Sequence, residues 1–264
     1  MNRTLVSTLA CALLALATAA LSGCKKDDVS SSTGAVALEF EHTVGTTPLV
    51  LGAGSYQNAR GESFSVSTFK YYLSNLKLNK ADGSSYAVPD AYFLVDQTDD
   101  ATQHLTLGTV PTSDYTSLTI TIGVDSARTK AGNFSGVLDA GKGMFWTMNG
   151  PEFINLKLEG YSPQAPHAPG AATGGLVFHI AGYRHSSTNT IRTVTLPFPT
   201  GVRLLVRSDH TPEVHLRVDA GQLFGAPNPT SFATTYNIMG GPTAARLADN
   251  AAAGMFSVEH IHAN

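Results

Sequence analysis

The sequence predicts an all-β protein: an antiparallel β-sandwich of a single domain, with one short helix near the C-terminus. Apolar and polar residues alternate in several separate stretches, a period of two that is typical of strands with one buried face. Turn-forming residues are abundant, with 25 Gly and 13 Pro in 264 residues. Only 14% of the residues are charged. Globular proteins average about 25%, so this composition argues against a coiled coil or a disordered chain.

The first predicted strand covers residues 36–42. Its apolar residues alternate, so Leu38, Phe40 and His42 are expected to share one face. Glu39 and Glu41 lie between them in the sequence and are expected to point to water. His42 therefore continues a buried face to the end of a strand, where a polar ring needs a specific partner.

Further strands are predicted at residues 118–124, 154–158, 176–180, 202–206 and 214–218. In the second of these, Ile154, Leu156 and Leu158 are expected to share a face. Clusters of Gly, Asp, Ser and Pro separate the strands and predict turns. One Ala-rich stretch, about residues 243–255, has high helix propensity and is the predicted helix. No repeat or linker divides the body, so residues 35–264 are predicted to form one domain.

The N-terminal segment is typical of an export signal. Residues 1–23 combine a positive start with an apolar run too short for a good membrane span, and end in Leu-Ser-Gly before Cys24, the lipobox pattern of bacterial lipoproteins. We expect Cys24 to be lipidated and residues 24–34 to form a polar tether. Lys25, rather than Asp, follows Cys24. This predicts a lipid anchor in the outer membrane, with the protein facing the periplasm or the cell surface.

Charge and cysteine usage exclude several classes of function. The formal net charge is −3 and the longest basic block is Lys25-Lys26, so no nucleic-acid partner is expected. The cysteines, Cys11 and Cys24, both precede the predicted domain, which therefore holds no disulfide and no thiolate ligand. The sequence has no GxSxG elbow, phosphate loop, HExxH motif or EF-hand loop. We expect a binding protein and not an enzyme.

Histidine is moderately enriched, with nine in a chain that has few charged residues. Four are expected to face inward or toward a strand end: His42, His179, His260 and His262. The last two continue the face of the preceding apolar residues of their strand, whereas the other histidines, His215 among them, are expected at the surface. A buried imidazole alone is more often a hydrogen-bonded core residue than a ligand. A cluster of them without thiolates favours copper, zinc or nickel.

Residues 143–150 contain Trp146, the only Trp, together with Met144 and Met148. One interpretation is a core aromatic residue beside flexible methionines that fill gaps. The other turns Trp146 and Met148 toward a metal ion, because a thioether is a soft ligand suited to Cu(I). Composition alone favours the first interpretation.

A series of short motifs occurs in one order through most of residues 36–262. They are Phe40-Glu41-His42 with Pro48-Leu49, Lys70-Tyr71-Tyr72-Leu73-Ser74-Asn75-Leu76, Gly123-Val124-Asp125, Gly143-Met144-Phe145-Trp146, Leu156-Lys157-Leu158-Glu159-Gly160, Phe178-His179, Ala248-Asp249-Asn250 and Met255-Phe256-Ser257-Val258-Glu259-His260-Ile261-His262. With these motifs the chain resembles the MbnP-like family of methanobactin-associated copper-binding proteins.

The resemblance implies an exported β-sandwich protein that binds one copper ion as Cu(I). In this family the first Trp of a W-x-W motif is oxidised to kynurenine by a di-haem enzyme of the MauG and cytochrome c peroxidase type, which would modify Trp146 here. Met148 stands in place of the second Trp. If the second Trp relays an electron hole, Met148 interrupts the oxidation. If the position faces copper, Met148 adds a soft ligand.

The resemblance also implies the copper ligands. His42 and His179 lie in the strongest matching motifs and are the first expected ligands. His260 and His262 are expected to follow, either as ligands or as residues that orient one. The ring nitrogen turned away from the metal needs an acceptor, for which the sequence offers Glu41, Asp96 and Asp125.

The resulting hypothesis is a periplasmic copper-binding lipoprotein that sequesters or transfers Cu(I) in copper homeostasis. Two alternatives stay open. A metal-free β-sandwich lipoprotein acting as an adhesion, scaffold or carbohydrate-binding module needs only the lipobox and the strands. A copper-dependent redox enzyme fits less well, because a domain without Cys lacks the ligand set of a blue-copper centre.

Overall fold

The computed structural model describes residues 32–132, 134–147, 151–166 and 174–264. The predicted signal segment 1–23, Cys24 and Met148 lie outside these residues. The first strand begins at Thr33, two residues before the predicted start of the domain, so the end of the predicted tether is part of the sheet. Within the described ranges, no helix combines the length and apolar character needed to span a bilayer.

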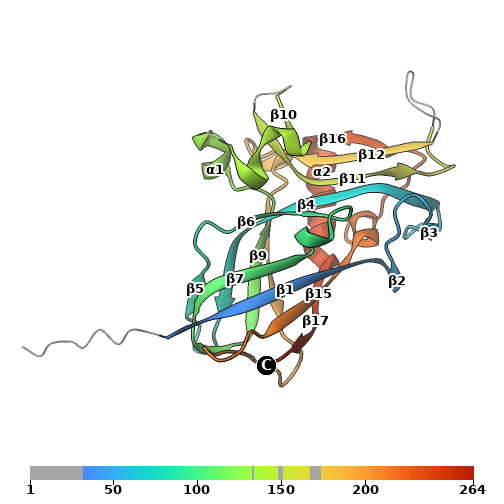
Figure 1. Ribbon diagram of the computed structural model, residues 1–264. Helices are drawn as coiled ribbons and strands as arrows, with labels where there is room; N and C mark the ends of the chain where they lie inside the picture. Colours follow the sequence, from blue (N-terminus) through green and yellow to red (C-terminus); the bar gives the residue numbers. More distant parts are fainter. Residues whose placement is uncertain (1–31, 133, 148–150, 167–173) are drawn as a thin grey trace, which may run out of the picture. The chain divides into compact units, whose positions relative to one another are not determined.

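The described chain forms three sheets, arranged as Figure 1 shows. A five-stranded sheet contains β1 (Thr33–Val44), β2 (Thr47–Pro48), β7 (His104–Pro111), β15 (Glu213–Asp219) and β17 (Phe256–His262). A ten-stranded sheet contains β3 (Tyr56–Gln57), β4 (Ser63–Asn79), β5 (Ser85–Ala87), β6 (Tyr92–Asp96), β9 (Ser117–Ile122), β10 (Phe145–Trp146), β11 (Glu152–Tyr161), β12 (Gly175–Ala181), β13 (Arg192–Pro197) and β16 (Asn237–Met239). A small third sheet pairs β8 (Ser113–Tyr115) with β14 (Leu204–Val206).

Short helices connect and cover these sheets. The α-helices are α1 (Ser126–Ala131) and α2 (Gly241–Gly254), and the 3-10 turns are η1 (Asp100–Thr102), η2 (Gly136–Leu138), η3 (Ala140–Lys142), η4 (Ser186–Thr188) and η5 (Ala220–Phe224). The helix predicted near residues 243–255 is α2. The six-residue α1 is too short to give a periodic pattern, and it begins where the Asp125 side chain accepts a hydrogen bond from the backbone of Arg128 at 2.9 Å.

The two large sheets pack face to face around the main hydrophobic core, which confirms the predicted β-sandwich. Leu38 and Phe40 of β1 contribute from the five-stranded sheet, and Phe69 and Tyr71 of β4 contribute from the ten-stranded one. The alternation predicted for residues 36–42 is also confirmed, because Glu41 on the other face is exposed. The sandwich is not wholly antiparallel: β1 pairs with β15, and β12 with β16, in parallel. These partners are far apart in the sequence, so no hairpin joins them.

A second, smaller core lies on the outer face of the large sheet. Tyr72 and Ala181 of the sheet belong to it, as do Met144 and Leu138 from the segment that runs through η2 and η3. The Tyr72 hydroxyl donates a 2.8 Å hydrogen bond to the carbonyl of Val137. The segment containing α1, η2, η3 and β10 is thereby held against this face.

A register shift in β11 changes one predicted face. Leu156 and Leu158 lie in the main core as expected, but Ile154 belongs to the outer core. The pairing of β11 with β12 shifts between Ile154 and Leu156, so Asn155 is an extra residue. Such a bulge inverts the side-chain alternation beyond it. The Asn155 amide uses this position to bind the backbone of Val124 at 3.0 Å.

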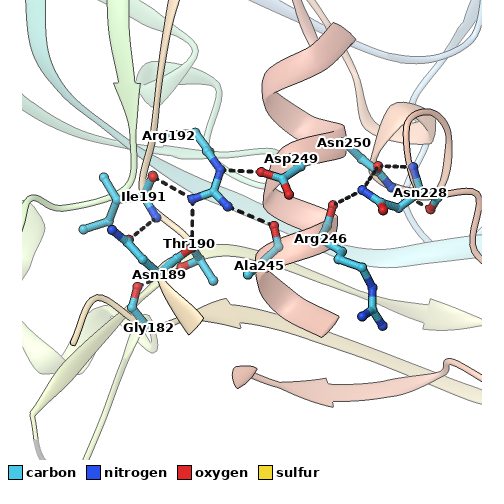
Figure 2. A network of polar contacts seen from close by, with 10 residues as sticks. All are labelled: Gly182, Asn189, Thr190, Ile191, Arg192, Asn228, Ala245, Arg246, Asp249 and Asn250. Atoms are coloured by element: carbon cyan, nitrogen blue, oxygen red, sulfur yellow. Dashed lines mark hydrogen bonds and ion pairs between the residues drawn. The ribbon is translucent and has the colours of Figure 1, made fainter. Parts of the chain in front are cut away.

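Two polar contacts fasten α2 to the sandwich (Figure 2). Arg192 of β13 pairs with Asp249 at 2.7 Å and donates to the carbonyl of Ala245 at 3.1 Å. On the other side of the helix, the fully buried Asn250 accepts from the backbone N–H of Asn228 at 2.8 Å. Asp249 and Asn250 of the motif Ala248-Asp249-Asn250 therefore hold α2 against the rest of the domain.

Candidate metal centre

His42 is a hydrogen-bonded residue between the two large sheets. Its ring packs edge-on against Phe69 and Tyr71 of β4, and only 4% of the residue is exposed. Nδ1 contacts the Gln97 side-chain oxygen, which can only accept, so Nδ1 carries the proton. Nε2 then accepts from the Tyr71 hydroxyl at 2.9 Å. Burial lowers the pKa of His42 to about 4, so the ring is neutral at neutral pH.

His179 lies on the opposite side of the large sheet from His42. It stands in register with Lys157 of β11, which is in register with Lys70 of β4. Lys70 and Tyr71 are neighbours in one strand, so their side chains point to opposite faces. His42 binds Tyr71 on the inner face, and His179 is therefore on the outer face. One ion cannot contact both histidines in this structure.

His179 instead meets Trp146 and a methionine. The ring centroids of His179 and Trp146 are 6.4 Å apart. Met239 of β16 is the direct register partner of His179, so the two side chains project from the same face of neighbouring strands. The Trp146 ring also lies beside Gly240, where an added Cβ would stand 3.6 Å from it. β12, β16 and β10 thus place an imidazole, a thioether and an indole on one side of the ten-stranded sheet.

Glu159 fixes the orientation of His179. The Nε2 atom of His179 donates to the Glu159 carboxylate at 2.8 Å, which leaves Nδ1 as the ring nitrogen available to a ligand. Burial lowers the pKa of His179, against the opposing effect of Glu159, which favours the neutral form of the ring. Burial alone raises the pKa of Glu159, but the hydrogen bond from His179 and the charge of Lys157 bring it below its ordinary value.

A pocket opens beside Trp146. It has a volume of about 330 Å³ and its walls include Trp146, Met239, Glu152 and Arg184. Glu152 and Arg184 form an ion pair at 3.3 Å. The Trp146 Nε1 atom is buried and has no hydrogen-bond partner among the described residues. The pocket therefore gives access from solvent to a site that has one unsatisfied polar atom.

None of the three acceptors expected for the ligand histidines is the carboxylate that binds His179. Asp96 forms an ion pair with Lys70 at 2.6 Å. Asp125 caps α1 and accepts from the Tyr92 hydroxyl at 2.6 Å. Glu41 is exposed on β1. The carboxylate that binds His179 is Glu159, which sits two residues from Lys157 on the neighbouring strand.

His260 and His262 lie elsewhere, on the outer face of the five-stranded sheet. They were expected to continue the inward face of Val258. The pairing of β17 with β15 shifts there, so that Val258 opposes Leu216 but His260 opposes His215, with Glu259 as the extra residue. Both histidines therefore project on the same side, as expected, but toward solvent.

The sequence did not point to Met239, and it predicted His215 only as a surface residue. Met239 comes from a three-residue strand with no alternating pattern, and its one sequence signal is the Gly240-Gly241 pair that follows it. His215 is correctly out of phase with its apolar neighbours, but its ring stacks on His260 with centroids 4.3 Å apart. Both contacts depend on pairing between distant strands, which no local pattern reports.

The fold and the site define a β-sandwich protein with an imidazole, thioether and indole cluster outside its larger sheet. The chain belongs to the MbnP family, whose model matches residues 33–240. Membership suggests a methanobactin-associated, copper-related protein. Among solved structures, MbnP from Methylosinus trichosporium has the same fold, with a TM-score of 0.52 at 12% identity over 79% of this chain and 83% of that one. The comparison with curated proteins gives no match.

Proposed function

We propose that this protein binds Cu(I) at the site formed by Trp146, His179 and Met239. The observation that carries the proposal is the register pairing of His179 with Met239 beside the Trp146 ring. A thioether and a neutral imidazole suit Cu(I), which is a soft ion. Glu159 holds the imidazole in the orientation that a ligand needs. His42, with both ring nitrogens hydrogen-bonded on the other side of the sheet, takes no part.

Trp146 supplies a further donor only after oxidation. An indole N–H group donates hydrogen bonds but has no lone pair with which to bind a metal ion. In this structure it has no hydrogen-bond acceptor among the described residues. Conversion to kynurenine replaces the indole with an aryl amine and a ketone, both with lone pairs. In the balanced step, indole C2 leaves as formic acid, two equivalents of hydrogen peroxide are consumed and one water is released. The partner in this proposal is a di-haem enzyme of the MauG and cytochrome c peroxidase type.

The proposal has two forms, which differ in the state of Trp146 and in the role of Met148. In one, Trp146 is oxidised although Met148 stands where the family has a second Trp. In the other, Trp146 stays an indole and Met148 joins Met239 and His179 as a soft ligand. A peptide map of the native protein separates these forms, because kynurenine has one carbon less and one oxygen more than Trp.

The cellular role follows from the proposed signal and anchor. Lipidation at Cys24 would tether the domain to the outer membrane, facing the periplasm or the cell surface. There it would sequester or transfer Cu(I) in copper homeostasis, as a binding protein and not as an enzyme. No nucleic-acid partner is proposed, in keeping with the net charge of −3.

The test is a Cu(I) competition against a chromophoric chelator, with protein purified from its own envelope under reducing conditions. We expect one equivalent of Cu(I) in the wild type. His179→Asn and Met239→Leu should each lower the affinity at least 10-fold, which is about 1.4 kcal/mol. His42→Asn is the matched control, a buried histidine outside the site, and should bind like the wild type.

Three outcomes would contradict the proposal. Loss of Cu(I) in His42→Asn but not in His179→Asn would move the site to the inner face of the large sheet. A wild type that takes up no Cu(I) would favour the metal-free sandwich. Turnover of an added substrate with a reversible Cu(II)/Cu(I) couple would instead indicate a redox enzyme.

A further inference from the structure

A row of polar side chains crosses the outer face of the five-stranded sheet. The register places His104 of β7 beside Glu39 of β1, Glu39 beside His215 of β15, and His215 beside His260 of β17. Side chains in register share a face, so these four residues line up across four strands. This face is remote from the Trp146 site, since β17 and β10 lie at opposite ends of the described domain (Figure 1).

Three histidines of this face converge on one point. His262 lies one alternation beyond His260, and the two Nε2 atoms are 2.8 Å apart. The His215 ring stacks on His260 at an interplanar angle of 17°, and its centroid is 4.4 Å from that of His262. One nitrogen from each of the three rings lies within 4.8 Å of the others. Three imidazoles are thus gathered, and the part of the chain that the structure describes contains no cysteine.

The hydrogen bonding of His215 prepares one nitrogen for a ligand. Its Nδ1 lies 3.0 Å from the Glu39 carboxylate, which can only accept, so Nδ1 carries the proton. Its Nε2 is then a lone-pair atom, and it is buried with no hydrogen-bond partner among the described residues. In metal sites, a carboxylate commonly accepts a hydrogen bond from one ring nitrogen of a histidine and so orients the other nitrogen toward the metal. Glu39 and His215 have this arrangement.

Glu213 is a second carboxylate close to the three histidine rings. It is the register partner of His262, and its carboxylate oxygen is 3.7 Å from Nε2 of His215. The charged groups that contact His215 are Glu39 and Glu213, while His104 faces Glu39 from the other side at 3.6 Å. Arg217, two residues further along β15, pairs with Glu259 at 3.3 Å. Two carboxylates beside three imidazoles favour a divalent cation over an anion or a neutral ligand.

We propose that His215, His260 and His262 bind a divalent transition-metal ion of the Zn²⁺ or Cu²⁺ class, with Glu39 as the positioning residue and Glu213 as the fourth donor. Ions of this class take imidazole and carboxylate ligands. In a tetrahedral zinc site two nitrogens lie about 3.3 Å apart, given bonds of about 2.05 Å. The Nε2 atoms of His260 and His262 are closer than that, at 2.8 Å, and one nitrogen of His215 lies within 4.8 Å of both rings. His260 and His262 are exposed and free to make the small rotations required.

The proposal is independent of the copper site and is tested on the full exported chain with Zn²⁺ as the probe. The chain is titrated in competition with a chromophoric zinc chelator, both as wild type and as His179→Asn, which removes the proposed copper ligand. We expect one equivalent of zinc in both. The double variant His260→Ala/His262→Ala should lose at least 100-fold in zinc affinity, and Glu39→Gln should lose 10- to 100-fold.

His210→Ala is the matched control, because His210 is a histidine on the surface that pairs with Asp209. It should bind zinc like the wild type. Cu²⁺ bound to the wild type should give an electron paramagnetic resonance spectrum with nitrogen hyperfine coupling, which the double variant lacks. The proposal is overturned if the wild type binds no zinc, or if zinc binding is unchanged when His215, His260 and His262 are all alanine. Cu(I) uptake that fails while zinc binding persists would count against the copper proposal alone.

Discussion

The buried His42 should make the stability of this protein depend on pH, and His42→Asn should remove that dependence. Burial lowers the pKa of His42 from 6.5 to about 4 in the folded state. The unfolded chain therefore takes up the proton first as the pH falls. Stability from this residue is complete above pH 6.5 and is lost as the pH falls toward 4.

The size of the effect follows from the displacement of the pKa. Each unit is worth about 1.4 kcal/mol, so the total loss is about 3.4 kcal/mol. Between pH 7.5 and pH 4.5, the same linkage gives a loss of about 2.5 kcal/mol. Asn at this position keeps a polar side chain for Gln97 and Tyr71 but carries no titratable proton. The free energy of unfolding of the variant should therefore fall by about 2.5 kcal/mol less over this range.

The assay is urea denaturation at pH 7.5, 6.5, 5.5 and 4.5, followed by the fluorescence of Trp146 and by circular dichroism. His104→Asn is a control in which the contribution of the histidine to stability changes with pH in the opposite direction. The backbone carbonyl of Asp100, with the charge of Glu39, raises the pKa of His104, so its stabilisation is lost as the pH rises. A His42→Asn profile parallel to that of the wild type would refute the inference that His42 is neutral in the folded protein.

Three further substitutions test the packing. Asn250→Ala should destabilise the domain by about 3 kcal/mol, measured by urea denaturation, because it leaves several buried backbone groups at the base of α2 without partners. Gly160→Ala should cost about 1–3 kcal/mol in the same assay, since the new Cβ would lie 1.9 Å from the carbonyl oxygen of Ser65, whereas Gly108→Ala meets no neighbour and should be neutral. Tyr72→Phe should cost about 1 kcal/mol and speed amide hydrogen exchange in residues 136–138, and unchanged exchange there would contradict the role given to its hydroxyl.

Local patterns predict the faces of strands where the alternation is unbroken. In β1 the buried face of Leu38, Phe40 and His42 follows directly from the sequence. At Asn155 and Glu259 one extra residue inverts the alternation, and the face predicted for Ile154 and for His260 is wrong for that reason. A bulge is decided by the partner strand, so the sequence of one strand does not reveal it.

The candidate site was predictable only in part for a similar reason. Trp146 and His179 stand out as an isolated aromatic residue and a histidine in an apolar strand. Their shared neighbour Met239 enters through a parallel pairing with β12, and such pairings between distant segments leave no trace in local periodicity. His42 and His179 are not brought together, because His42 of β1 points into the space between the two large sheets, whereas His179 of β12 points away from that space on the outer face of the ten-stranded sheet.

The position of the two proposed metal sites on the outsides of opposite sheets has a consequence for how ions would move. Sheets pack about 10 Å apart, and the space between these two is filled by Phe69, Phe178 and other apolar side chains. A dehydrated cation cannot cross such a layer at a useful rate. An ion leaving the surface cluster at His215 would reach Met239 only through the surrounding water. Each site would therefore equilibrate separately with metal ions in the surrounding solution. The protein would bind two ions, and no ion would pass from one site to the other through its interior.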